Sequence, residues 1–195
     1  MPAPKRTTDA DVIAAGRRLI AERGLDGLTM QAVASAVGVR APSLYKRVRG
    51  RDELIRLVVE STLGELEERL TRVVSRAHSD PRAVVEALVV ELRTFAHGDP
   101  SGFALAFGGA PAEARPSIEV LARSAAPLTT ATTQLVGPEH ALAAARTVTA
   151  WAVGFVTMEL TGAFQLGGDV DSAFAWGLSR LIEAVADPGQ RTASS

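Results

Sequence analysis

The residues best suited to binding chemistry lie between positions 40 and 51, where five cations and no acidic residue occur in twelve positions. Cations neutralise phosphate groups, and hydroxyl groups donate hydrogen bonds to phosphates and base edges. The cations are Arg40, Lys46, Arg47, Arg49 and Arg51, and Ser43 and Tyr45 lie among them. The segment therefore predicts a contact with nucleic acid, while composition alone leaves open a solvated helical hairpin with a charged surface.

The sequence around these residues predicts two short helices separated by a turn. Thr29 can cap a helix whose apolar residues recur at positions 30, 33, 34 and 37. Gly38 follows where that helix must end, because glycine enters the left-handed conformation at little cost. Pro42 suits the first turn of a second helix, and Leu44 and Val48 face inward from it. This order predicts a helix-turn-helix whose basic second helix enters a major groove.

Residues 8–56 resemble the DNA-binding domain of the tetracycline-repressor (TetR) family. The shared stretches are Gly-Leu-Asp-Gly-Leu-Thr at 24–29, Ala-Val-Ala at 32–34, Gly-Val at 38–39, Leu-Tyr-Lys-Arg at 44–47 and Arg-Asp-Glu-Leu at 51–54. The chain departs from the family at Arg47, where relatives often carry histidine, and at Val48, where they often carry an aromatic residue. The resemblance implies a transcriptional regulator.

Docking of a helix-turn-helix in the major groove, supported by this resemblance, gives each residue an expected role. We expect Lys46 to reach a guanine edge, and Ser43 and Tyr45 to bond phosphates or bases. Arg51 is expected to clamp a phosphate, and the extra arginine at 47 to strengthen phosphate contact. The expected DNA contacts are Thr29, Gln31, Arg40, Ala41, Pro42, Ser43, Tyr45, Lys46, Arg47 and Arg51.

The composition agrees with a helical protein whose DNA-binding part is basic. Of 195 residues, 47% are hydrophobic and only 5% aromatic, which suits an all-α packed core. Residues 1–55 carry ten lysines and arginines against six acidic residues, whereas the remainder carries eleven against sixteen. The absence of cysteine excludes disulfides, thiolate zinc sites and a cysteine nucleophile. With no signal-peptide pattern and no apolar run near twenty residues, we expect a cytoplasmic protein without a membrane partner.

The helical pattern predicts an all-α fold: a three-helix DNA-binding domain over 1–52 and a helical domain for effector binding and dimerisation over 53–195. The boundary falls inside a long helix that begins near residue 51. The other expected helices span 8–24, 80–98, 112–137 broken at Pro116 and Pro127, 138–166 and 169–187, with a short apolar piece at 103–107, an arm at 1–6 and a tail at 191–195.

The two C-terminal helices carry more apolar surface than one subunit can cover. Paired across a twofold axis they would make a four-helix bundle, although a helix buried within one monomer stays open. A homodimer would also double a recognition helix that alone reads few base pairs. Residues 151–164 resemble a C-terminal domain type of TetR-like regulators that carries Trp and then His-Gly, but Val153 stands at the histidine position.

The resemblance implies that the C-terminal domain binds a small effector, whose binding releases a repressor from its operator. An apolar or amphipathic effector is expected because few charges lie near the aromatic residues. Core packing is the alternative for the wall residues, and a surface or dimer-rim carboxylate is the alternative for Glu159. The candidates are Phe95, Phe103, Phe107, Trp151, Phe155 and Met158 as walls, with His97, Thr157 and Glu159 as polar contacts.

The sequence offers little support for an enzyme. His78, His97 and His140 lie far apart without acidic residues at metal spacing. No phosphate loop and no Gly-x-Ser-x-Gly pattern occurs. We therefore expect no catalytic residue, metal or cofactor. A helical ligand-binding or scaffold protein whose basic hairpin is incidental, and which binds no specific DNA, remains the alternative.

Overall fold

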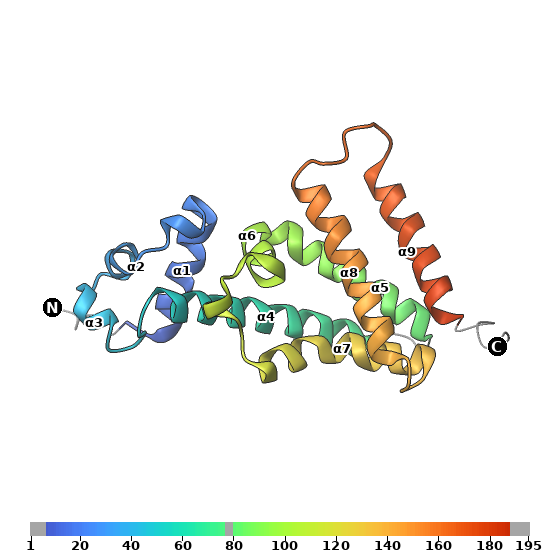
Figure 1. Cartoon of the computed structure of the whole chain (residues 1–195), viewed down its shortest axis with the longest axis horizontal. Helices are drawn as coiled ribbons and strands as arrows, with labels where there is room; N and C mark the ends of the chain where they lie inside the picture. Colours follow the sequence, from blue (N-terminus) through green and yellow to red (C-terminus); the bar gives the residue numbers. More distant parts are fainter. Residues whose placement is uncertain (1–6, 77–79, 188–195) are drawn as a thin grey trace. The chain divides into compact units, whose positions relative to one another are not determined.

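The computed structural model describes residues 7–76 and 80–187, and within these ranges the chain forms helices and turns but no strand. The all-α fold predicted from the sequence is therefore confirmed (Figure 1). The predicted arm at 1–6, the tail at 191–195 and the helix end near His78 lie outside the described residues. The elements are α1 Asp9–Arg23, η1 Leu25–Gly27, α2 Met30–Ala36, α3 Ala41–Leu44, α4 Arg51–Arg76, α5 Pro81–Gly98, α6 Pro100–Ala104, η2 Leu105–Gly109, η3 Ala112–Ala114, α7 Ile118–Val136, α8 Ala141–Leu160 and α9 Val170–Ala186.

The chain divides into two compact units, each built from two stretches of sequence. The first unit comprises Met1–Glu65 and Asp99–Leu121, and the second comprises Leu66–Gly98 and Ala122–Ser195. Helix α4 supplies residues to both. The functional division at residue 52 stays a prediction.

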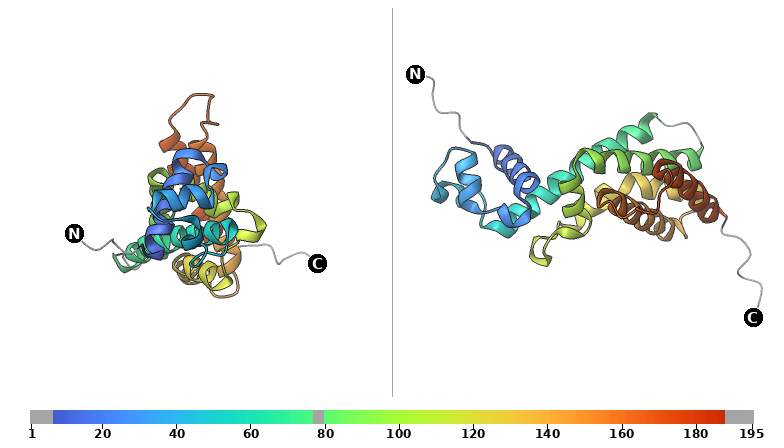
Figure 2. Two further views of the ribbon diagram at one scale, coloured as in Figure 1. Left: turned by 90° about the vertical axis from the view of Figure 1, so that its left-hand side faces the viewer. Right: turned by 90° about the horizontal axis from the view of Figure 1, so that it is seen from above.

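Helix α1 and the first half of α4 pack closely in the first unit. A Cβ atom at Gly16 would lie 3.1 Å from Cγ2 of Val58 and 3.6 Å from Cδ1 of Leu54. Leu28, just before α2, is fully buried beside them. Figure 2 shows α1 in blue next to the cyan start of α4. This close pair forms the base that supports the short helices α2 and α3.

Arg17 of α1 joins the two stretches of the first unit. Its Nη2 donates to Glu65 of α4 over 2.9 Å and to Asp99 over 2.6 Å. Asp99 also caps α6, because its side chain accepts from the backbone N–H of Gly102. Burial opposes the charge on Arg17, but the hydrogen bonds to both carboxylates outweigh burial and raise its pKa. The ion pairs thus hold the start of α6 against α1.

The cap predicted at Thr29 is confirmed, and the start of α1 is capped in a similar way. Thr8 accepts from the N–H of Asp11, and the Asp11 carboxylate accepts from the N–H of Thr8, which completes a capping box. Thr29 caps α2 by accepting from the N–H of Ala32 over 3.1 Å. Gly24 ends α1 with φ 68°, and Gly38 forms the turn after α2 with φ 71°. The local sequence therefore determines where these helices begin and end.

The second unit has a core of α5, α8 and α9, whose aromatic residues gather between α8 and α9. The ring of Phe174 lies 5.5 Å from Trp151 and 5.2 Å from Phe155, measured between centroids. Gly177 of α9 faces Trp151, and a Cβ atom there would lie 2.7 Å from Cζ2 of the indole. Glycine therefore permits the close approach of α9 to α8, which run side by side in Figure 1.

Two predictions in the C-terminal half were wrong. Pro127 does not break α7, which continues from Ile118 to Val136 through this proline, whereas the predicted break at Pro116 precedes the helix. The helix predicted over 138–166 is shorter, because α8 spans only Ala141–Leu160. Gly162 ends it with φ 68°, and the N–H of the following residue bonds back into the last turn.

The expectation that no apolar run approaches twenty residues also needs correction. Helix α8 has 20 residues, and its most apolar window has a mean hydropathy of 1.3, with 33% of that window buried. By length and composition it resembles a membrane span, but core helices of soluble proteins have the same properties. Most residues of this apolar window are therefore not buried by the chain itself.

Replacing Gly177 by alanine is expected to destabilise the second unit. The added methyl group must displace Trp151, and overpacking of this kind costs about 1–3 kcal/mol, more than the roughly 1 kcal/mol that alanine gains over glycine in a helix. Thermal unfolding followed by circular dichroism measures the effect. Gly64→Ala in α4 is the control, since its Cβ would meet no atom within 4 Å. Equal melting temperatures for the two variants would contradict this packing account.

Candidate functional site

Helices α2 and α3 form a compact helix-turn-helix in the first unit. The N–H of Val39, after the turn, donates to the carbonyl of Ala34 over 2.9 Å. Helix α3 is only four residues long, and hydrogen-bonded turns continue it as far as Arg47. Leu44 is fully buried and Val48 is 2% exposed. The two anchors predicted from the sequence therefore fix α3 from inside and turn its other side chains outward.

The outward side of this motif carries most of the predicted DNA contacts. Tyr45 is 53% exposed, unusual for so large an apolar ring, and Ala41 is half-buried. Thr29 uses its hydroxyl oxygen to cap α2, which leaves its hydrogen able to donate outward. The exposed members of the predicted set are Thr29, Gln31, Arg40, Pro42, Ser43, Tyr45, Lys46 and Arg47. The motif thus presents donors, cations and apolar groups together.

Two of the five cations are bonded within the protein. Nη1 of Arg47 donates to Oδ1 of Asp9, the first residue of α1, over 2.6 Å. Arg51 donates to backbone carbonyls of the segment that precedes α2. Among the described residues, Arg40, Lys46 and Arg49 have no ion-pair partner. Sequence reasoning missed Asp9 because the pair spans 38 residues of chain.

The predicted effector residues divide between the two units. Phe103 and Phe107 belong to the first unit, where their ring centroids lie 4.9 Å apart. The other seven candidates belong to the second unit. There Phe95 is buried beneath the guanidinium of Arg69, whereas Met158 is 47% exposed. Core packing, the alternative left open above, therefore describes Phe95 and Phe103 directly.

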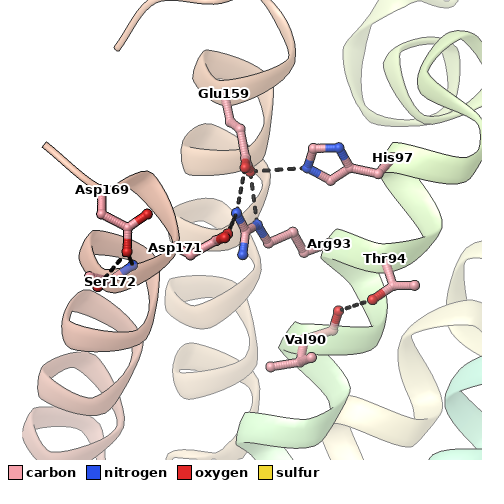
Figure 3. Close-up of polar contacts among 8 residues, drawn as sticks. All are labelled: Val90, Arg93, Thr94, His97, Glu159, Asp169, Asp171 and Ser172. Carbon is pink, nitrogen blue, oxygen red and sulfur yellow. Dashed lines mark hydrogen bonds and ion pairs between the residues drawn. The ribbon is translucent and has the colours of Figure 1, made fainter. Parts of the chain in front are cut away.

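Glu159 of α8 lies at the centre of an ionic cluster with α5 and α9 (Figure 3). Its carboxylate accepts from Nε of Arg93 over 2.9 Å and from Nη2 of the same residue. Nε2 of His97 lies 3.3 Å away, and Arg93 also bonds Asp171 at the start of α9. The guanidinium lies over the ring of Phe174, 4.5 Å from its centroid. Arg93, Asp171 and Phe174 were not assigned to a site from the sequence, because their partners are distant in the chain.

The bonds within this cluster shift the pKa values of its members. Hydrogen bonds from Arg93 lower the pKa of Glu159, against the effect of burial, and His97 adds to the lowering. The bond to Glu159 raises the pKa of Arg93 in turn. Glu159 is therefore an ionised carboxylate already bonded by its own chain. Within the described residues no three histidines or carboxylates gather closely enough to hold a metal ion.

Comparison with known proteins bears on both units. Residues 12–58 match the sequence profile of bacterial regulatory proteins of the tetR family, and residues 85–181 match that of the tetracyclin repressor-like C-terminal domain. The chain belongs to the TetR family of transcriptional regulators. The profile matches support the predicted resemblance in both halves, while the Trp-His-Gly detail stays a prediction.

Relatives and solved structures agree with this membership. An HTH-type transcriptional regulator of Mycobacterium tuberculosis is 29% identical over 104 residues, covering 51% of this chain and 43% of that regulator, so the chain spans less than half of the curated relative's length. A protein of unknown function from Rhodococcus sp. RHA1 has the same fold, with a TM-score of 0.78 at 24% identity over 95% of this chain and 100% of that one. A TetR variant from Acinetobacter baumannii AYE, in complex with minocycline, gives a TM-score of 0.69 at 26% identity. The match covers 92% of this chain and 96% of that one.

The stability of the TetR-like second unit is expected to depend on the charge of Glu159, and therefore on pH. Because Arg93 lowers the folded-state pKa of Glu159, the pair stabilises the protein above the ordinary glutamate pKa of about 4.3 and is lost as pH falls through the lower folded value. Glu159→Gln should lower the free energy of unfolding at pH 7 by roughly 1.5–3 kcal/mol, since a charged hydrogen bond is lost.

Denaturant unfolding from pH 7 to pH 3 measures this difference. The gap between Glu159→Gln and the wild type should shrink in acid. Glu183→Gln is the control, because Glu183 pairs with Arg180 on the exposed side of α9. A gap that stays constant over this pH range would show that the Glu159 charge contributes nothing to stability.

Proposed function

We propose that the protein is a dimeric, sequence-specific DNA-binding regulator in the cytoplasm, a repressor that a small, largely apolar effector releases from its operator. The observation that carries the proposal is the outward side of α3 and its turn, where Tyr45 and unpaired cations lie on a rigid, capped helix-turn-helix. Such a side supplies both the phosphate attraction and the base-edge contacts that operator recognition needs. Family membership supports the DNA-binding role.

Each exposed residue has a proposed contact. Lys46 bonds a guanine edge, and Tyr45 and Ser43 bond bases or phosphates. Ala41 and Pro42, at the start of α3, contact a thymine methyl group. The remaining contacts are to the DNA backbone, from Thr29, Gln31, Arg40 and Arg47. Arg47 must exchange Asp9 for a phosphate to make its contact.

Dimerisation through α8 and α9 is proposed from the outer side of α8. Of the exposed side chains on this helix, Arg146 is the only charged one. The others include Leu142, Met158 and the small residues Ala150 and Gly154. Small and apolar side chains let a second helix approach closely, as in a four-helix bundle, and a twofold partner supplies such a helix. The large uncovered share of α8 supports the same arrangement.

The effector is proposed to be small and largely apolar. The similar TetR variant from Acinetobacter baumannii is bound to minocycline, which supports a ligand-binding role for this chain. Trp151, Phe155 and Met158 are the proposed walls in the second unit, and the half-buried Phe107 is a proposed wall in the first. Because Arg93 and His97 already bond Glu159, aromatic side chains are better suited than this carboxylate to contact a ligand.

Selection of bound duplexes from a random DNA pool, near physiological salt, tests the function. Recovery of an inverted repeat with half-sites about one helical turn apart, or somewhat closer, would support a dimeric operator-binding regulator. Recovery of no enriched motif, with binding lost steeply as salt rises, would leave only non-specific electrostatics. The alternative of a helical scaffold or carrier would then be favoured.

Tyr45→Ala and Lys46→Ala are each expected to abolish preferential binding to the selected operator without unfolding the protein. Both side chains are exposed, so their removal leaves the core intact. Each lost base contact costs about 1–3 kcal/mol, roughly 5- to 150-fold, in each half-site. Fluorescence anisotropy measures operator affinity, and Arg72→Ala, an exposed cation of α4 in the second unit, is the control. Unchanged affinity in either variant would remove that residue from the interface.

Gly154→Arg is expected to yield a folded monomer that no longer binds the operator tightly. No atom lies within 4 Å of a Cβ at Gly154, so the chain itself accommodates the side chain, whereas a second α8 packed there would not. Analytical ultracentrifugation measures the oligomeric state. Glu86→Arg on the exposed side of α5 is the control for an added arginine. A Gly154→Arg protein that stays dimeric would contradict an interface on this side of α8.

A further inference from the structure

Arg51, the first residue of α4, bonds inward with two donors of its guanidinium. Nε donates to the backbone carbonyl of Leu28 over 2.8 Å, and Nη2 donates to that of Leu25 over 2.7 Å. The residue is half-buried. Charge-assisted bonds from a planar guanidinium are strong and directional, so this pair fixes both the distance and the angle of the carbonyls.

The two acceptors belong to the segment that leads into α2. Leu28 directly precedes Thr29, the N-cap of α2, so its carbonyl lies outside the hydrogen-bond ladder of that helix. Its side chain is fully buried between α1 and α4. Leu25 begins the turn η1, and its carbonyl also accepts from the N–H of Leu28. Arg51 therefore bonds the segment at both ends of one short turn.

This turn has little freedom to adjust if the bonds are lost. Gly24 begins it with φ 68°, and a Cβ atom at Gly27 would lie 2.3 Å from Cβ of Arg23. The turn thus returns tightly over the end of α1. A segment held so closely transmits a displacement at Leu28 directly to the start of α2.

The position of Arg51 is unfavourable for α4 itself. A cation in the first turn faces the positive end of the helix dipole, where Asp52 and Glu53 are the favoured residue type. Helix stability therefore does not explain an arginine at this position. The two carbonyl bonds do, because they offset the cost and join α4 to the entry of α2.

We infer that Arg51 is a positioning residue that locks the helix-turn-helix against α4, and that it is not a phosphate clamp. The inference rests on the proposed DNA-binding function and deepens it. Helix α2 is joined to α3 through the bond from Val39 to Ala34, so the angle of α2 on α4 sets the angle of the recognition residues. Phosphate neutralisation is left to other cations, among them Arg40, which has no ion-pair partner among the described residues.

Arg51→Lys and Arg51→Gln separate positioning from phosphate contact. Lysine keeps the charge, but a single ammonium group does not reproduce the two-donor fork. If Arg51 positions α2, both variants lose about tenfold or more in preference for the selected operator over a random duplex. The slope of log affinity against log salt on the operator should then stay the same, because no phosphate contact is removed. Arg40→Gln is the matched control, because it removes an exposed cation that is proposed to contact the DNA backbone.

Two results would overturn the inference. If Arg51 clamps a phosphate, Arg51→Lys retains operator binding and Arg51→Gln lowers the magnitude of the salt slope by about 0.9 per protomer. If the bonds serve stability alone, both variants melt at lower temperature but keep the wild-type operator preference when measured well below their melting temperature. Circular dichroism at the temperature of the binding measurement shows whether each variant is folded.

A measurement on the wild-type protein keeps the test valid if neither variant folds. The arginine Nε–H resonance of Arg51, assigned by nuclear magnetic resonance, should exchange slowly with water in the free protein and stay unshifted when the operator binds. A large shift on operator binding would instead indicate a new phosphate partner and overturn the inference. If the wild-type protein binds no DNA preferentially, the proposed function fails, while the free-protein resonance still reports the bond to Leu28.

Discussion

Helices α1 and α4 approach each other so closely at Gly16 that a methyl group there would lie 3.1 Å from Val58. The contact places the buried side of α4 beneath Leu28, and so determines where α2 can begin. Arg51 then adds two polar bonds at the edge of this apolar contact. Packing supplies most of the attraction, but it is not directional, and the hydrogen bonds add the orientation that packing lacks. The recognition side of α3 depends on both.

The helix ends that could be predicted are those with a local cause. Thr8, Thr29 and Asp169 each accept a bond from an N–H three residues onward, which a single stretch of sequence encodes. Gly162 ends α8 through its positive φ, which is also a local cause, but the apolar pattern continues beyond it and so predicts too long a helix. Pro127 is different, since a proline removes one donor but its surroundings decide whether the helix continues. The aromatic packing between α8 and α9, including the space left by Gly177, has no counterpart in any short stretch.

The predictions for the candidate site also divide into features that have a local cause in the sequence and features that depend on the fold. Residue type and helical period predicted which side of the helix-turn-helix faces outward, and the burial of Leu44 and Val48 agrees. The internal partners of the cations were not predictable, because Arg47 reaches Asp9 across 38 residues and Arg93 reaches Glu159 across 66. A charge in a sequence has many acceptors within reach of the folded chain, and only the fold selects one. Predictions of binding residues from charge alone therefore overcount those available to a ligand.

Internal pairing of cations also bears on how such a motif discriminates among DNA sequences. Every cation available to phosphates strengthens binding to all duplexes alike, so it raises non-specific and specific affinity together. Discrimination is the ratio of the two affinities, and base contacts raise that ratio whereas phosphate contacts do not. The inward bonds of Arg51 withdraw positive charge from the general attraction, and the bond from Arg47 to Asp9 weakens it because a phosphate must replace Asp9. The bonds of Arg51 also hold the segment before α2, and with it the orientation on which base contacts depend. A helix-turn-helix with five cations can thus bind random DNA more weakly than its charge suggests while keeping a well-oriented recognition side.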